Sequence, residues 1–159
     1  MYFDALSFLE DEREAWRPFE VLDQLSDDEL ERPVETLNGW SGRDLMAHLT
    51  AWLEVSLAAA KELAVNETSR TIERMDAEWE AGGDALNDRL LADWRARPME
   101  EVRQRFRTVP GELRGYLTVV PETRWIGNAK HQASFLGESL EHYGEHVADL
   151  RAVLAQAGR

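Results

Sequence analysis

Apolar residues recur at intervals of three and four along four long stretches of the chain, which is the spacing of one helix face. The first stretch runs from about Phe3 to Leu25, and Pro18 within it predicts a bend or a break. The second stretch begins at Ser41. The residues expected to face the core are Leu6, Leu9, Trp16 and Phe19 in the first stretch, and Leu45, Leu49, Trp52, Ser56, Ala60 and Leu63 in the second.

The start of the second helix is marked by the letters GWSGRD, residues 39–44. The Ser41 hydroxyl can accept a hydrogen bond from the amide of Asp44, and the Asp44 carboxylate can accept one from the amide of Ser41. Trp40 precedes this capping box and is placed to pack on Leu45. These signals predict where the helix begins and therefore which later residues share its faces.

The segment 66–97 has a weaker period and carries two glycines at 82–83. Glycine is unfavourable inside a helix, so we expect a break there. One short helix is predicted before the break and a second after it, capped by Asp84. The apolar residues that indicate these helices are Ile72, Met75 and Trp79, then Leu86, Leu90 and Trp94.

Two further long helices are predicted in the C-terminal half. The third helix should be kinked by Pro110, and the last should run from about Ser134 to Gln156 after a loop at 121–132. Their apolar positions are Val102, Phe106, Val109, Leu113, Leu117 and Val120, then Leu136, Leu140, Tyr143, Val147, Leu150 and Leu154. Strand signals are nearly absent, so we expect an all-α fold of antiparallel packed helices.

Length and composition exclude several classes of function. A chain of 159 residues is expected to form a single domain, residues 1–159. Its formal charge of -13 argues against binding nucleic acid or an anionic membrane surface. The chain has no cysteine, so any sulfur chemistry must arrive with a small molecule. The acidic N-terminus and the lack of a long apolar run predict a soluble, cytoplasmic protein.

Histidines supply the most specific chemical signal. His142 and His146 stand four residues apart in the last helix, so both rings project from one face beside the apolar seam. His48 occupies the same kind of flanking position in the second helix, one residue before Leu49. In a bundle the three imidazoles can converge on one divalent ion and leave it an open coordination position. His131 falls in the predicted loop, where we expect a surface residue.

Other interpretations of these residues remain open at the level of sequence. The alternative is that the histidines are half-exposed residues that satisfy local hydrogen bonds. Trp52 is one turn beyond His48 and can belong to the core or to the wall of a substrate pocket. Arg13 interrupts the apolar stripe of the first helix and can be a surface residue or an anion-binding pocket residue. Acidic residues are numerous, so no catalytic acid or base can be assigned.

Two segments, GWSGRDLMAHLTAW (39–52) and EHYGEHVADLR (141–151), resemble the DinB/YfiT-like metalloprotein superfamily, which includes the mycothiol-dependent maleylpyruvate isomerase N-terminal domain and the ClbS/DfsB branch. The resemblance implies an antiparallel four-helix bundle with an up-down-down-up connection. Residues 66–97 would then be the long helical crossover between the second and third helices. By the family pattern, His48, His142 and His146 are the metal ligands.

The same resemblance suggests what the protein does. Members carry out thiol-dependent transfer or isomerisation with mycothiol or bacillithiol, and a few are hydrolases. We therefore expect a metal-dependent enzyme that holds Zn²⁺ or Ni²⁺ and acts on a small molecule with a low-molecular-weight thiol. The alternative is a non-catalytic protein that sequesters a small molecule or a metal in stress or toxin resistance. Many relatives are homodimers, which this composition permits.

Overall fold

The computed structural model describes residues 1–159 and is all-helical, as predicted. It contains no β-strand, and its one β-type pairing is an isolated bridge between Pro33 and Ser41. The α-helices are α1 (Ala5–Trp16), α2 (Asp27–Glu31), α3 (Gly42–Val65), α4 (Arg70–Arg95), α5 (Met99–Val119), α6 (Ala129–Leu136) and α7 (His142–Gln156). Tighter or wider turns form η1 (Arg17–Gln24), η2 (Glu35–Leu37), η3 (Glu122–Arg124) and η4 (Gly137–Glu141).

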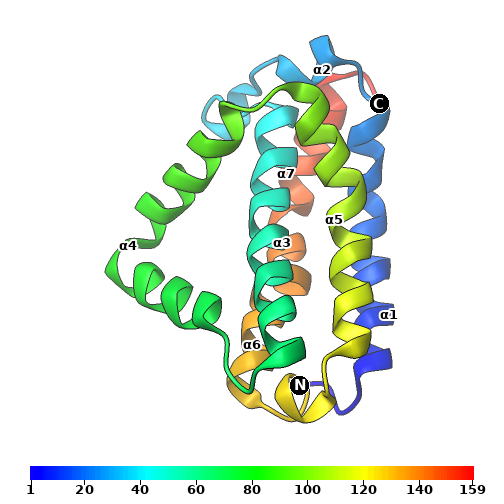
Figure 1. Cartoon of the computed structure of the whole chain (residues 1–159). Coiled ribbons are helices and arrows are strands. Elements are labelled where there is room, and N and C mark those ends of the chain that lie inside the picture. The colour runs from blue at the N-terminus through cyan, green and yellow to red at the C-terminus, as the bar shows by residue number, and fades with distance from the viewer.

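Four helical columns lie along one long direction, formed by α1, by α3, by α5 and by α6 with α7 (Figure 1). The chain runs one way in α1 and α7 and the opposite way in α3 and α5. The bent helix α4 stands apart and joins the end of α3 to the start of α5. Helix α3 contacts both α5 and α4, so it is the central element of the fold.

The main core lies among the four columns and contains 32 buried residues. Aromatic side chains join its elements, since the Trp16 ring lies 4.9 Å from Phe106 and 5.2 Å from Tyr143, measured between centroids. A second cluster of Trp52, Met75 and Leu86 is separate from this core and holds α4 against α3. The middle of α4 therefore packs on this small cluster, whereas Ile72, Leu91 and Trp94 near its two ends belong to the main core.

The first predicted helix is divided in two. α1 ends at Trp16 and the chain continues as the 3₁₀ turns of η1, where Pro18 stands at the start. Proline has no amide hydrogen to continue an α-helical ladder, which is the physical reason for the predicted break. The side chain of Leu6 is 65% exposed, so its expected core position is wrong, whereas Phe8 is buried instead.

The predicted break in the segment 66–97 is confirmed. Helix α4 bends at Gly82, whose φ of 168° and ψ of 86° are not helical. Gly83 has a packing role, because an added Cβ would lie 3.0 Å from two ring atoms of Trp79. The glycine pair therefore both bends the helix and leaves room for an indole ring.

The last helix begins earlier than predicted and is not regular. Asn128 caps α6 by accepting from the amide of His131, which places residue 131 in a helix and not in a loop. His131 is 6% exposed, and its Nδ1 donates to the carbonyl of Arg124 at 2.5 Å, so the expected surface position is wrong. A π-helical turn, η4, then separates α6 from α7.

The third predicted helix corresponds to α5, which runs through Pro110 without a break.

Candidate metal centre

Three imidazoles meet at one point between α3 and α7. The Nε2 atom of His142 lies 2.8 Å from Nε2 of His48 and 3.1 Å from Nε2 of His146. One ligand nitrogen from each of the three rings lies within 4.8 Å of the others. The structure thus brings together residues that are separated by most of the chain.

Hydrogen bonds cannot satisfy this arrangement. A neutral imidazole nitrogen carries either a hydrogen or a lone pair, and Nε2 of His142 has two nitrogen neighbours. If Nε2 of His142 donates a hydrogen bond to one of these nitrogens, the other nitrogen has no partner. If Nε2 of His142 instead accepts from one of them, the other again has no partner. A cation that takes all three lone pairs, at ligand distances of about 2.0–2.1 Å, removes the conflict. The three nitrogens therefore fit a divalent metal ion.

Local structure fixes the directions of the rings. The predicted capping box is present, with the Ser41 hydroxyl accepting from the Asp44 amide and the Asp44 carboxylate accepting from the Ser41 amide, and it sets the register of α3. On α7, the Nδ1 hydrogen of His146 points to Oδ2 of Asp149 at 2.6 Å. Because Nδ1 carries the hydrogen, Nε2 of His146 has a lone pair that faces the cluster. Carboxylates orient metal-bound histidines in the same way.

Burial keeps two of the rings neutral. The pKa of His48 is lowered to about 3 by burial and then by the neighbouring His142 and His146. The pKa of His142 is also lowered to about 3, by burial and by His146, with the carbonyl of Glu138 acting in the opposite direction. Nδ1 of His48 has no hydrogen-bond partner. Both rings therefore present free lone pairs at neutral pH, as metal ligands must.

A cavity of about 680 Å³ opens beside the histidines, between α3, α4 and the α6–α7 column. Its lining residues are Trp40, His48, Trp52, Met75, Asp76, Trp79, Glu80, Asn87, Ala133, Ser134, Gly137, Glu138, Glu141, His142, Glu145 and His146. A volume of this size accommodates a small organic molecule next to the three Nε2 atoms.

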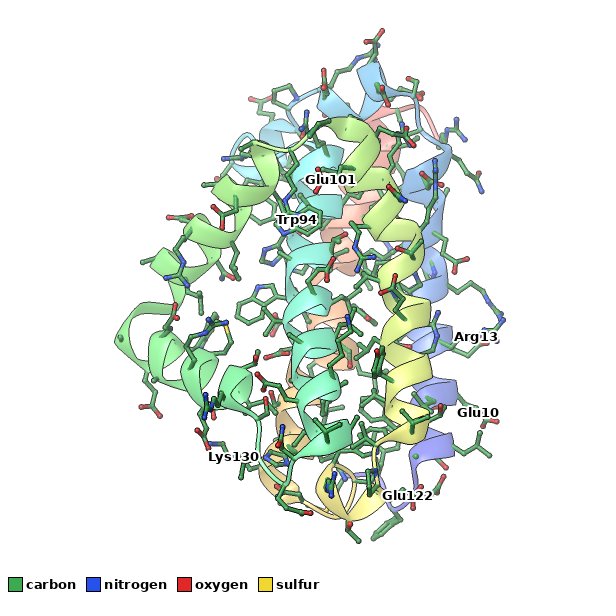
Figure 2. All side chains as sticks on the ribbon, viewed as in Figure 1. Glu10, Arg13, Trp94, Glu101, Glu122 and Lys130 are labelled. Carbon is green, nitrogen blue, oxygen red and sulfur yellow. The ribbon has the colours of Figure 1, made fainter.

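The two residues predicted for a substrate pocket have different positions. Trp52 lines the cavity, and its Nε1 donates to Oδ1 of Asn87 at 2.9 Å, which fixes the indole plane. Arg13 does not line it. This residue is exposed on α1, on the side of the molecule away from α4 (Figure 2), because Glu12 and Trp16 occupy the buried face of that helix.

Trp40 and Trp79 also line the cavity, which the sequence did not indicate. Trp40, expected to pack on Leu45, has its ring centroid 5.1 Å from that of His48 in an edge-to-face arrangement. It also stacks on His146, with a centroid distance of 6.4 Å and an interplanar angle of 15°. Helix α4 brings Trp79 to the cavity, where its ring centroid lies 6.0 Å from that of Trp52.

Glu138 is the acidic residue that sequence analysis could not single out. It lies in the π-helical turn η4 and accepts from the hydroxyls of Ser56 at 2.6 Å and Ser134 at 3.4 Å. Burial raises its pKa to about 7, although both hydroxyls act to lower it. A carboxyl group with this pKa can exchange a proton near neutral pH. No spacing rule predicts the π turn that places it here.

None of the helices combines the length and the apolar character needed to cross a membrane.

Comparison with known proteins identifies the family. The model of the mycothiol maleylpyruvate isomerase N-terminal domain matches residues 9–144, which include His48 and His142 and end just before His146. No curated protein and no solved structure matches the chain. The family match covers most of the sequence and agrees with the two motifs that resemble DinB-like proteins. The chain belongs to the mycothiol maleylpyruvate isomerase N-terminal domain family, within the DinB-like superfamily.

Proposed function

We propose that this protein is a metal-dependent enzyme that transfers or isomerises a small molecule with the help of a low-molecular-weight thiol. His48, His142 and His146 would hold the ion, which is zinc or nickel, and mycothiol or bacillithiol would be the thiol. The convergence of the three Nε2 atoms at the floor of a cavity is the observation that carries this proposal. Closed structural metal sites lack such an opening.

The thiol part of the proposal has two supports. The family is named for a mycothiol-dependent isomerase. The chain itself has no cysteine, so it supplies no thiol nucleophile of its own. A divalent ion bound by three imidazoles lowers the pKa of a thiol at its open position and so favours the thiolate at neutral pH.

The protein's own residues would bind, orient and move protons. The hydrogen bond from His146 to Asp149 holds one ligand ring in place. Trp52 is held by Asn87 and, with Trp40, walls the cavity and displaces water from it. Glu138 can take up the proton that a thiol loses on binding, because its carboxyl group lines the same cavity and its pKa is about 7.

We propose that residues 1–159 form one domain and that its four columns are an up-down-down-up four-helix bundle with α4 as the crossover. The chain directions, one way in α1 and α7 and the opposite way in α3 and α5, support this (Figure 1). A cytoplasmic location and a homodimer stay predictions from the sequence and the family resemblance.

Metal analysis of protein purified without a histidine tag tests the proposal. We expect about one equivalent of zinc or nickel per chain, and His142→Ala should abolish it. His131→Ala is the matched control, because it removes a histidine that lies outside the cluster, and circular dichroism reports folding in both variants. A chain that binds no metal under any condition of purification contradicts the proposal. Bound metal without consumption of any thiol or electrophile in a panel would favour sequestration.

A further inference from the structure

Apart from the three histidines, all ionisable residues that line the cavity are acidic. They are Asp76, Glu80, Glu138, Glu141 and Glu145, and neither lysine nor arginine lines it. Asp76 is neutralised by Lys130, with 3.1 Å between Nζ and Oδ2. Glu80, Glu138, Glu141 and Glu145 have no ion-pair partner. We call Glu80, Glu141 and Glu145 the acidic rim, since all three are exposed at the cavity.

The floor and walls of the cavity also indicate a ligand. His48 is only 4% exposed at the floor, and its Nδ1 has no partner. Three indole rings, of Trp40, Trp52 and Trp79, form the walls, and the Trp52 and Trp79 planes meet at 76°. The face of an indole ring attracts a cation, and two or more rings around a cavity recognise organic ammonium groups.

The cavity still attracts cations when a metal ion is bound, because its net charge stays negative. A divalent ion contributes two positive charges, whereas the acidic rim and an ionised Glu138 contribute four negative charges. An ionised thiol would add one more negative charge. The cavity is therefore negative in every loaded state, and low-dielectric walls strengthen its field. A carboxylate that enters is repelled, and an ammonium group is attracted.

We infer that the substrate of this site carries an ammonium or another organic cation and that the site discriminates against dicarboxylates. This inference rests on the proposed function, because it names the substrate class of the same cavity. Maleylpyruvate, the substrate in the family's printed name, is a dicarboxylate and does not suit this cavity. The cation would contact the acidic rim and the indole faces, and the reacting carbon would face the three histidines.

Calorimetric titration with two aromatic probes tests the inference. Benzyltrimethylammonium and phenylacetate have similar rings and opposite charges. We expect the ammonium probe to bind at least about tenfold more tightly to both metal-free and zinc-loaded protein, since several carboxylates act on one charge at short range. Binding of phenylacetate with equal or higher affinity overturns the inference, as does the failure of both probes to bind.

Matched variants show where the preference arises. The triple variant Glu80→Gln, Glu141→Gln and Glu145→Gln should bring the ratio of the two Kd values close to one. A control variant makes the same substitution at Glu10, Glu20 and Glu100, which are exposed, unpaired and outside the cavity. Figure 2 shows Glu10 on α1, away from α4. The control should keep the wild-type ratio, and an equal loss in both triple variants contradicts the inference.

The metal content of the same samples separates this inference from the proposed function. If the protein binds no zinc but still prefers the ammonium probe, the proposed function fails and the charge preference of the cavity stands. If zinc binds and phenylacetate is preferred, the metal site stands and the substrate class is wrong.

Discussion

The hydroxyl of Tyr143 donates to the buried carboxylate of Glu12 at 2.8 Å and so ties the start of α7 to α1. Arg114 of α5 donates to the other oxygen of the same carboxylate at 2.8 Å. Glu12 is 1% exposed, so this charge depends on its two partners. Tyr143 follows His142 directly, and the network therefore anchors the helix that carries two of the three histidines.

Removal of the Tyr143 hydroxyl should weaken the fold without reaching the metal centre. We expect Tyr143→Phe to lower the free energy of unfolding by about 1–3 kcal/mol, because it leaves a buried carboxylate oxygen without a donor. Chemical denaturation measures this cost. Tyr116→Phe is the control, since Tyr116 is 38% exposed and its hydroxyl has no hydrogen bond in the structure. An equal loss in both variants would contradict the role of the network.

Asp149 should set the metal affinity through His146. We expect Asp149→Asn to weaken zinc binding by roughly 10- to 100-fold, because a neutral amide orients the imidazole and supports its basicity less well than a carboxylate. Competition with a chromophoric chelator measures the change. Glu10→Gln removes one negative charge far from the cluster and should leave the affinity unchanged. If it weakens binding equally, the effect comes from net charge.

Acidification should destabilise the metal-free protein. His48 and His142 have folded pKa values of about 3 against 6.5 in the unfolded chain, so the unfolded state binds two more protons between these values. Glu138 acts oppositely, since its folded pKa of about 7 lies above 4.5 and its protonation stabilises the fold at lower pH. Two histidines outweigh one carboxyl group, so stability falls as pH decreases below 6.5.

The melting temperature measured from pH 7 to pH 5 in the presence of a chelator checks this sign. The variant His48→Gln with His142→Gln cannot take up these protons and should lose the decrease. A decrease of the same size in the variant would show that other groups cause it.

Glu138 should control the pH dependence of catalysis. We expect Glu138→Gln to lower kcat by roughly 10²- to 10⁴-fold and to remove an inflection near pH 7 from the rate profile, because an amide cannot exchange a proton. The amide oxygen can still accept from Ser56, and the zinc content should not change. A rate profile that keeps its inflection would assign the titrating group to another residue.

Local signals in the sequence were sufficient to predict that the three histidines meet. The Ser41 capping box fixes the register of α3 and hence the direction of His48, and four-residue spacing fixes the relation of His142 to His146. Both effects operate within one or two helical turns. The convergence of the two helices then follows from the apolar seams beside these residues.

Other parts of the cavity depend on contacts that are distant in the sequence. Glu138 enters the cavity because of a π turn, and its high pKa comes from burial among residues of α3, α4 and α6. Trp79 lies on the first arm of α4, where its ring packs over Gly83 beyond the bend and against Trp52 of α3. His131 is buried and hydrogen-bonded to the Arg124 carbonyl, and the helical spacing of apolar residues does not predict this contact. Arg13 is exposed, which is one of the two positions that the sequence left open for it.

The small cluster of Trp52, Met75 and Leu86 makes one wall of the cavity energetically separable from the rest of the protein. An outward movement of the middle of α4 exposes this cluster alone, whereas Ile72, Leu91 and Trp94 near the two ends of α4 stay packed in the 32-residue core. Such a sub-global opening needs much less free energy than complete unfolding. Amide hydrogens in the middle of α4 should therefore exchange with solvent well before those of α3, and ligands can enter and leave while the three imidazoles keep their places.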